Sequence, residues 1–194
     1  MNIATKMIIV LTVITAFAGG ILSTWDGFTK PKIEAYRLQE LKKAIAEVLP
    51  AHESYEEINQ DGTILYLGKK NDLDEPVGIA FEAVGSGFQG KISMMVGVSV
   101  DFSQVRGIKI LEQIETPGLG TKIVEDPSNK QDRYWFTNQF KDLQAAPIIE
   151  VVKNKKPTKP TEIEAITGAT ISSKAVVTII NDNLQKAKKT YQKM

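Results

Sequence analysis

A short run of small and hydroxyl residues stands directly before the last helical pattern of the chain. It reads Thr167-Gly168-Ala169-Thr170 and continues into Ile171-Ser172-Ser173. Small residues leave the Thr170 hydroxyl exposed, and a helix start offers unpaired backbone N–H groups and the positive end of the helix dipole. The run therefore favours either phosphate binding at Thr170 or simple capping of the helix by a hydroxyl side chain.

A second stretch of this kind, Glu115-Thr116-Pro117-Gly118-Leu119-Gly120, ends a predicted strand. Two glycines around one leucine let the backbone turn sharply and come close to a ligand. A plain turn at a strand end would have the same composition. The stretch is thus a candidate ligand loop, and its neighbours in space decide between the two interpretations.

Other residue types that carry chemistry are scarce in this chain of 194 residues. It has no cysteine, which excludes disulfides, thiolate metal sites, iron–sulfur ligation and cysteine nucleophiles. Its one histidine, His52, cannot form a histidine-rich metal site, and we expect it at a helix end or on the surface. The net charge of +1 gives no electrostatic case for nucleic acid binding. We expect no catalytic acid, base or nucleophile.

Taken together, residues 167–170 and 115–120 resemble the two signatures of the FMN-binding domain family. That family includes the G subunit of the Rnf complex and the C subunit of the sodium-pumping NADH:quinone oxidoreductase. Residues 87–90 resemble a glycine-containing turn of the same domains, and Trp135 with residues 139–141 resembles another family element. Where many members have aspartate ahead of the flavin attachment motif, this chain has Glu164. The short chain favours the Rnf subunit over its longer relative.

The resemblance implies that a flavin transferase, with FAD as donor, joins FMN through its phosphate to the Thr170 hydroxyl. Leu119 would contact the flavin ring, Thr116 and Lys122 would offer polar contacts, and the start of the last helix would neutralise the phosphodiester. Trp135 is expected in the core rather than stacked on the ring. The full set of residues implied at the cofactor is Glu115, Thr116, Gly118, Leu119, Gly120, Lys122, Thr167, Gly168, Ala169, Thr170, Ile171 and Ser172.

The same resemblance implies an electron relay within an Rnf-type ferredoxin:NAD oxidoreductase, beside other membrane and peripheral subunits, in a path coupled to Na⁺ or H⁺ translocation. Three alternatives stay open. The chain is a C-type subunit of the sodium-pumping quinone reductase, a stand-alone anchored extracellular flavoprotein, or a non-redox binding module whose Thr170 is only a helix cap.

Hydrophobic periodicity predicts that these residues belong to an α+β domain with a largely antiparallel sheet packed by helices. Consecutive strands with tight connections indicate a meander. The strands are expected at residues 63–67, 77–83, 91–100, 106–113 and 148–152, with turns at 61–62, 71–72 and 85–87. Helices are expected at residues 31–49, 133–141 and 171–191, and a solvated basic loop at 153–159. The first helix should bury Ile33, Tyr36, Leu41, Ile45 and Val48, and Pro50 should end it.

The amino-terminal segment is apolar from Met7 to Trp25, just long enough to cross a bilayer as a helix. A cleaved export signal that ends near Ala16-Phe17-Ala18 is the alternative. The positive-inside rule does not decide the orientation, but either type of segment normally exports the domain that comes after it. We therefore expect a single-pass anchor in the cell (inner) membrane at residues 1–25, a linking helix at 26–50 and an extracytoplasmic FMN-binding domain at 51–194.

Overall fold

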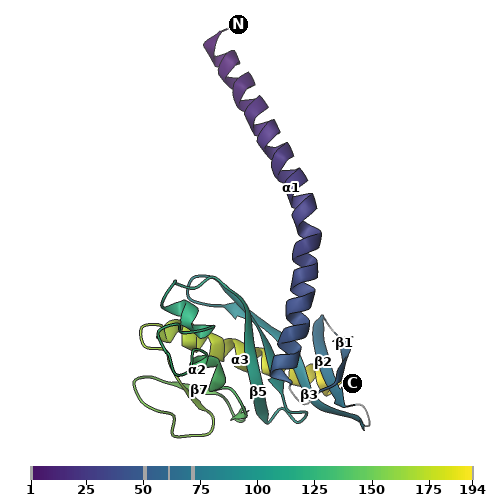
Figure 1. Cartoon of the computed structure of the whole chain (residues 1–194), viewed down its shortest axis with the longest axis vertical. Helices are drawn as coiled ribbons and strands as arrows, with labels where there is room; N and C mark the ends of the chain where they lie inside the picture. The colour runs from purple at the N-terminus through teal and green to yellow at the C-terminus, as the bar shows by residue number, and fades with distance from the viewer. Residues whose placement is uncertain (1, 50–51, 61, 71–72, 194) are drawn as a thin grey trace. The chain divides into compact units, whose positions relative to one another are not determined.

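The computed structural model describes residues 2–49, 52–60, 62–70 and 73–193 of the chain (Figure 1). The chain separates into two compact units, one that ends at Glu40 and one that begins at Leu41. The elements, in chain order, are α1 (Ile3–Val48), β1 (Ser54–Gln60), β2 (Thr63–Lys70), β3 (Leu73–Ser86), β4 (Lys91–Val98), β5 (Gln104–Gln113), the 3₁₀ helix η1 (Gly120–Ile123), α2 (Trp135–Asn138), β6 (Leu143–Gln144), β7 (Glu150–Val152), β8 (Glu162–Glu164) and α3 (Thr170–Tyr191).

Strands β1 to β6 form one antiparallel sheet in which every strand pairs with the next along the chain. This order confirms the predicted α+β fold with an antiparallel meander. Strands β7 and β8 form a separate parallel pair. Helix α3 lies along the large sheet and contacts β3 and β2 (Figure 1).

Both faces of the large sheet are covered, so residues on both faces of β4 are buried. Its alternate residues point to opposite faces of the sheet. Met94 and Val96 pack into the main core with α3, whereas Met95 packs into a second cluster with Ile45 and Val48 of α1. From Ile92 to Val98 every residue of β4 is buried, and Ser93 is the one polar side chain among them.

The predicted strands correspond to β2, β3, β4, β5 and β7, with ends that differ by a few residues. Three strands were missed: β1, β6 and β8. The last two are only two and three residues long, and β1 reads as a polar loop because most of its side chains are exposed. The predicted helix at 133–141 is shorter, as α2, and the last helix begins one residue earlier, at Thr170. The predicted turn at 71–72, Asp61 of the first turn and Pro50 lie outside the described residues.

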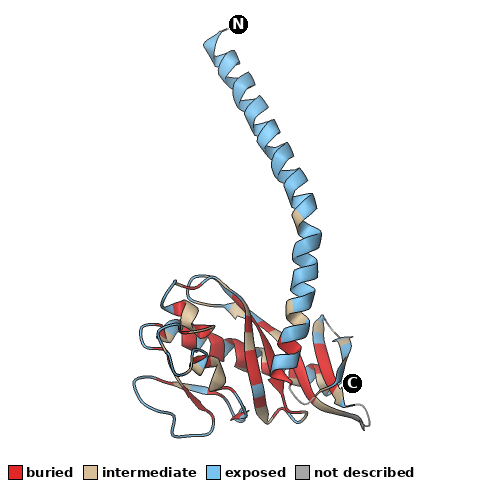
Figure 2. Ribbon diagram, in the orientation of Figure 1, coloured by how far each residue is buried: buried red, intermediate tan, exposed pale blue. Residues whose placement is uncertain are grey.

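The prediction that a new helix begins at Pro31 is wrong. Helix α1 runs from Ile3 to Val48 with Pro31 inside it, so the proline costs one hydrogen bond without ending the helix. Ile33 and Tyr36, predicted to be core positions, are 63% and 65% exposed. Most of α1 is exposed (Figure 2). Its buried face begins later and includes Ile45 and Val48, as predicted.

Helix α1 is, within the described residues, the one helix whose length and apolar composition suffice to cross a membrane; an export signal would satisfy the same criteria. Its threonines do not require water as a hydrogen-bond partner. Thr12 Oγ1 donates to the Ile8 carbonyl at 2.8 Å, and Thr15 Oγ1 donates to the Leu11 carbonyl at 2.7 Å. Back-bonding of this kind satisfies a hydroxyl inside an apolar segment.

Helix α3 is held at both ends. Near its start, Ser173 is fully buried, and its hydroxyl donates to the Ala169 carbonyl at 3.0 Å. At its other end, the Tyr191 ring lies 5.8 Å, centroid to centroid, from the ring of Phe102 in the turn between β4 and β5. The helix therefore connects the loop before Thr170 with the opposite end of the β4–β5 hairpin.

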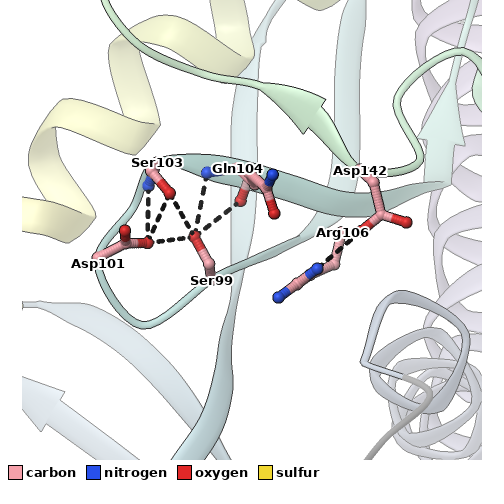
Figure 3. A network of polar contacts seen from close by, with 6 residues as sticks. All are labelled: Ser99, Asp101, Ser103, Gln104, Arg106 and Asp142. Carbon is pink, nitrogen blue, oxygen red and sulfur yellow. Dashed lines mark hydrogen bonds and ion pairs between the residues drawn. The ribbon is translucent and has the colours of Figure 1, made fainter.

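A carboxylate organises that β4–β5 turn (Figure 3). Asp101 Oδ1 accepts hydrogen bonds from Ser99 Oγ at 2.5 Å, from Ser103 Oγ at 2.8 Å and from the Ser103 backbone N–H at 3.1 Å. These bonds, that from Ser99 first, lower the pKa of Asp101 to about 2. Farther along the hairpin, Arg106 pairs with Asp142 at 2.8 Å.

The low pKa of Asp101 predicts a loss of stability in acid. A carboxyl group whose pKa is lower in the folded state stabilises the protein above its unfolded pKa, and that contribution disappears as the pH falls through its folded pKa. We expect Asp101→Asn to unfold at lower urea concentration than wild type near neutral pH, with the difference vanishing between about pH 4 and pH 2. Urea unfolding of the detergent-solubilised full chain measures this. A difference that is independent of pH would contradict it.

Candidate cofactor site

A surface pocket of about 390 Å³ lies at the start of α3. Four segments that are distant in sequence form its walls: the turn before β4, the loop after β5, the loop after β7, and the loop that leads into α3. The residues that line it are Phe88, Thr116, Leu119, Gly120, Lys153, Asn154, Thr167, Gly168, Ala169, Thr170, Ile171 and Ser172.

The two stretches singled out from sequence meet in this pocket. Gly168 has a φ of +83°, a conformation that L side chains rarely adopt, and the position that its Cβ would occupy lies 3.2 Å from Leu119 Cδ2. The leucine of the first stretch therefore packs against the glycine of the second. Because glycine adopts this backbone angle without strain and leaves room for the contact, the close approach of the two loops explains why Gly168 stands there.

Thr170 is the first residue of α3, and its side chain is half-buried at the pocket. The residue that precedes the helix is Ala169, and no side chain caps the helix start. The simple capping interpretation of Thr170 is therefore wrong. Within the described residues, the Thr170 hydroxyl makes no hydrogen bond to protein atoms, in contrast to its two serine neighbours.

The hydroxyls of those neighbours are both occupied. Ser172 Oγ donates to Glu115 Oε2 at 2.5 Å. Ser173 Oγ donates to the Ala169 carbonyl and accepts from the Ile166 backbone N–H, each at 3.0 Å. Three hydroxyl residues thus stand in the first turn of α3, and Thr170 is the one whose hydroxyl is left for a ligand.

The helix start also supplies polar groups of its own. The N–H groups of an α-helix's first turn have no acceptor within the helix, and they lie at the positive end of its dipole. Here they belong to Thr170, Ile171 and Ser172. An anion such as a phosphate is favoured at this position, directly beside the free Thr170 hydroxyl.

Glu115 lies behind the pocket wall rather than in it. The residue is 4% exposed and does not line the pocket. Oε1 accepts hydrogen bonds from the backbone N–H groups of Phe88 at 2.8 Å and Gln89 at 3.2 Å, and Oε2 accepts the bond from Ser172. One side chain therefore links three of the segments that form the pocket.

Not every residue implied at the site from sequence reaches the pocket. Gly118 and Lys122, like Glu115, do not line it. Lys122 Nζ instead lies 3.2 Å from Asp126 Oδ2 and 3.3 Å from Ser128 Oγ. Trp135 packs against the main core, with its ring 6.1 Å from that of Phe136, as expected for a core residue.

Three lining residues were missed from sequence: Phe88, Lys153 and Asn154. Phe88 sits within the glycine-containing turn, so its signal was an aromatic residue between glycines. Lys153 belongs to the predicted basic loop, whose charges favour a solvated segment. Those charges do not indicate which part of the folded domain the loop contacts. The structure brings that loop to the pocket and adds a cation to the wall.

A buried carboxylate secures the far end of this basic loop. Glu162 Oε2 accepts hydrogen bonds from the backbone N–H groups of Thr158 at 2.8 Å and Lys159 at 3.3 Å. The bond from Thr158 contributes most to lowering the pKa of Glu162, to about 2. Gln139 binds the backbone of Glu164 through both its amide oxygen and its amide nitrogen, and thereby holds β8 against α2. Both contacts position the chain that leads into residues 167–170.

The sequence model described as the FMN-binding domain matches residues 87–185, from the glycine-containing turn into α3. Because the match spans half of the chain and contains every segment of the pocket wall, the chain belongs to the FMN-binding domain family. The resemblance predicted from residues 115–120 and 167–170 is confirmed.

Two relatives that are named as subunits of oxidoreductase complexes align with most of the chain. The chain is 33% identical over 180 residues to the G subunit of the ion-translocating oxidoreductase complex of Methanosarcina acetivorans, covering 89% of this chain and 88% of the relative. It is 30% identical over 201 residues to the G subunit of the Na(+)-translocating ferredoxin:NAD(+) oxidoreductase complex of Acetobacterium woodii, covering 95% and 91%. The crystal structure of Shewanella oneidensis NqrC shares the fold, with a TM-score of 0.56, 18% identity, and coverage of 73% of this chain and 70% of that one.

Proposed function

We propose that this chain is an electron-transfer subunit of a membrane-bound Rnf-type ferredoxin:NAD oxidoreductase and carries FMN joined through its phosphate to the Thr170 hydroxyl. The observation that carries the proposal is the free Thr170 hydroxyl at the start of α3, within the pocket of an FMN-binding domain. Relatives that are named G subunits of such complexes and align over most of the chain support the assignment to this type of complex.

The pocket fits the phosphate end of FMN. The backbone N–H groups at the start of α3 provide donors for phosphate oxygens, and the helix dipole favours their negative charge. Lys153, the one cation among the described residues that line the pocket, adds positive charge to the wall. The Thr170 oxygen stands among these groups, where a phosphoester bond would form.

The pocket also fits the ring end of FMN. Three large apolar side chains at its wall are largely exposed: Phe88 at 56%, Leu119 at 46% and Ile171 at 60%. Apolar surface left exposed around a polar site is typical of a binding surface. These side chains would hold the isoalloxazine ring, which supplies the one-electron chemistry when FMN is bound.

Attachment of FMN is a substitution at phosphorus without a redox change. The Thr170 oxygen would attack the phosphorus atom on the flavin side of the FAD pyrophosphate, with cleavage of the bond to the bridging oxygen and departure of AMP. The hydroxyl proton must pass to a base. Among the described residues, none that lines the pocket carries a carboxylate or an imidazole, so the proposal assigns that base to a flavin transferase.

A covalent bond suits a surface pocket of this kind. Retention of the cofactor becomes independent of binding affinity, so the pocket residues need only orient the ring and shield part of it. One edge of the ring can then face a redox partner. On this proposal the isolated chain relays electrons and turns over no substrate, and the other subunits of the complex supply its donor and acceptor.

We further propose that the first part of α1 lies in the cell membrane. Residues 1–25 would be the single-pass anchor, residues 26–50 the link, and residues 51–194 the FMN-binding domain on the extracytoplasmic side. The apolar composition of α1 and the back-bonded hydroxyls of Thr12 and Thr15 support a bilayer location. Coupling of the electron path to Na⁺ or H⁺ movement would be a property of the assembled complex.

Intact mass and in-gel fluorescence of the full chain, produced together with a flavin transferase, test the proposal. We expect flavin fluorescence that survives denaturation and a mass increase equal to FMN less one water. Digestion should place the added mass on the peptide that contains Thr170. An unmodified chain in the presence of a transferase shown to be active on another substrate would refute the covalent assignment.

A further inference from the structure

Glu115 is a buried carboxylate that the proposed function leaves without a role. It lies outside the pocket lining, but its carboxylate bonds to two of the segments that form the pocket wall and joins them to a third, the loop that Glu115 itself begins. We propose that Glu115 is a positioning residue: through these hydrogen bonds it sets the relative placement of the wall segments and thereby the orientation of the bound flavin. This inference rests on the proposed attachment of FMN at Thr170.

The hydrogen bonds of Glu115 reach far along the chain. Phe88, whose N–H binds Oε1, lies 27 positions before Glu115, and Ser172, whose hydroxyl binds Oε2, lies 57 positions after it. Glu115 itself begins the loop that carries Leu119. All three segments supply lining residues. Moving this carboxylate would therefore move the wall on both sides of Thr170.

The Glu115 side chain packs closely against two glycines. At Gly87, a Cβ atom would lie 2.3 Å from Glu115 Oε1, and at Gly120 it would lie 2.8 Å from Glu115 Cβ and 2.9 Å from both Glu115 Oε2 and Ser172 Oγ. The Glu115 backbone is fixed as well, because its N–H donates to Gln113 Oε1 at 2.6 Å. Two glycines thus clear the space that the carboxylate fills, which is the packing expected of a fixed structural link.

Because the proposed covalent bond would retain the flavin, the positioning role of Glu115 can be measured separately from retention of the cofactor. A flavin joined to Thr170 stays on the chain even when the wall is disturbed, so loss of Glu115 should free the ring to move without releasing it. The motion of the attached ring is therefore the quantity that reports on Glu115.

The test compares Glu115→Ala and Glu115→Gln with wild type by time-resolved fluorescence anisotropy of the attached flavin, in the full chain in detergent. In Glu115→Ala we expect the amplitude of fast ring motion to rise at least about twofold. Glutamine can rebuild the contacts, because its amide oxygen accepts from Phe88 and Gln89 and its amide N–H donates to Ser172 Oγ. Glu115→Gln should therefore restore the anisotropy of wild type.

The matched control is Asp101→Asn, which alters another carboxylate with three hydrogen bonds at the opposite end of the β4–β5 hairpin. It should lower stability without changing ring motion. If Glu115→Ala does not fold, Ser172→Ala, which removes the bond to α3 alone, should still increase ring motion. Wild-type anisotropy in both Glu115→Ala and Ser172→Ala would overturn the positioning role. Absence of attached flavin in wild type would instead overturn the proposed function.

Discussion

Replacing Thr170 by alanine is expected to abolish covalent flavin, whereas replacing it by serine should preserve it. On the proposed function, one side-chain oxygen atom would form the phosphoester bond, and serine supplies that atom whereas alanine lacks it. The serines at 172 and 173 should not substitute for it, because the first donates to Glu115 and the second is fully buried. Intact mass and fluorescence after denaturation measure attachment in each variant.

Ser173→Ala provides the reciprocal control. Its buried hydroxyl makes two hydrogen bonds, so its loss should lower the free energy of unfolding by about 1–3 kcal/mol and leave flavin attached. Thr170→Ala should change stability by less than about 0.5 kcal/mol, because its hydroxyl bonds to nothing in the described protein. Full attachment in Thr170→Ala, or equal attachment to Ser172 in that variant, would contradict the assignment of the acceptor hydroxyl.

Gly97→Ala should destabilise the domain more than Asp101→Asn does. A Cβ atom at this position of β4 would lie 2.2 Å from the Val48 carbonyl oxygen and 2.8 Å from Val48 Cβ. The obstacle includes backbone, so the end of α1 would have to lift from the sheet and expose the cluster of Ile45, Val48 and Met95. We expect a loss of about 3 kcal/mol in the free energy of unfolding.

Gly107→Ala is the matched control, because Gly107 pairs directly with Gly97 in the ladder between β4 and β5. The atom nearest to a Cβ added at Gly107 would be Val48 Cα, at 3.8 Å, which is an ordinary van der Waals contact. Its free energy of unfolding should stay within about 1 kcal/mol of wild type. Urea unfolding of the detergent-solubilised full chain distinguishes the two variants. Similar midpoints for both would show that the end of α1 does not rest on β4.

The local sequence pattern was sufficient to predict an element where burial and secondary-structure propensity agree. The apolar run that forms β4 is predictable because both of its faces are buried, and the last helix is predictable from its apolar face. Strand β1 is different: its sequence is polar, yet it pairs with β2 along its full length. Pairing to a neighbouring strand overrides a weak intrinsic preference, and no local signal in these residues reports that neighbour.

The candidate site likewise contains some residues that could be predicted from the sequence and others that could not. Residues 115–120 and 167–170 were recognisable as a pair of motifs, and the structure brings Leu119 and Gly168 into contact. The position of Lys122 was not predictable, because its partner Asp126 competes with the pocket for the cation. The contacts of Glu115 span 27 and 57 positions of sequence, so its link between segments becomes visible only once the chain is folded.

On the proposed function, the way in which helix α3 is held bears on the rate of electron transfer. Its 22 residues correspond to a rod of about 33 Å, held near Thr170 by Ser173 and at the far end by the contact of Tyr191 with Phe102. When an electron arrives, the charge of the site changes, and any protein rearrangement that results adds to the activation barrier. A wall fixed at both ends and already polarised toward negative charge rearranges little. The reorganisation energy of a flavin on Thr170 should therefore be small, leaving distance and driving force to set the rate.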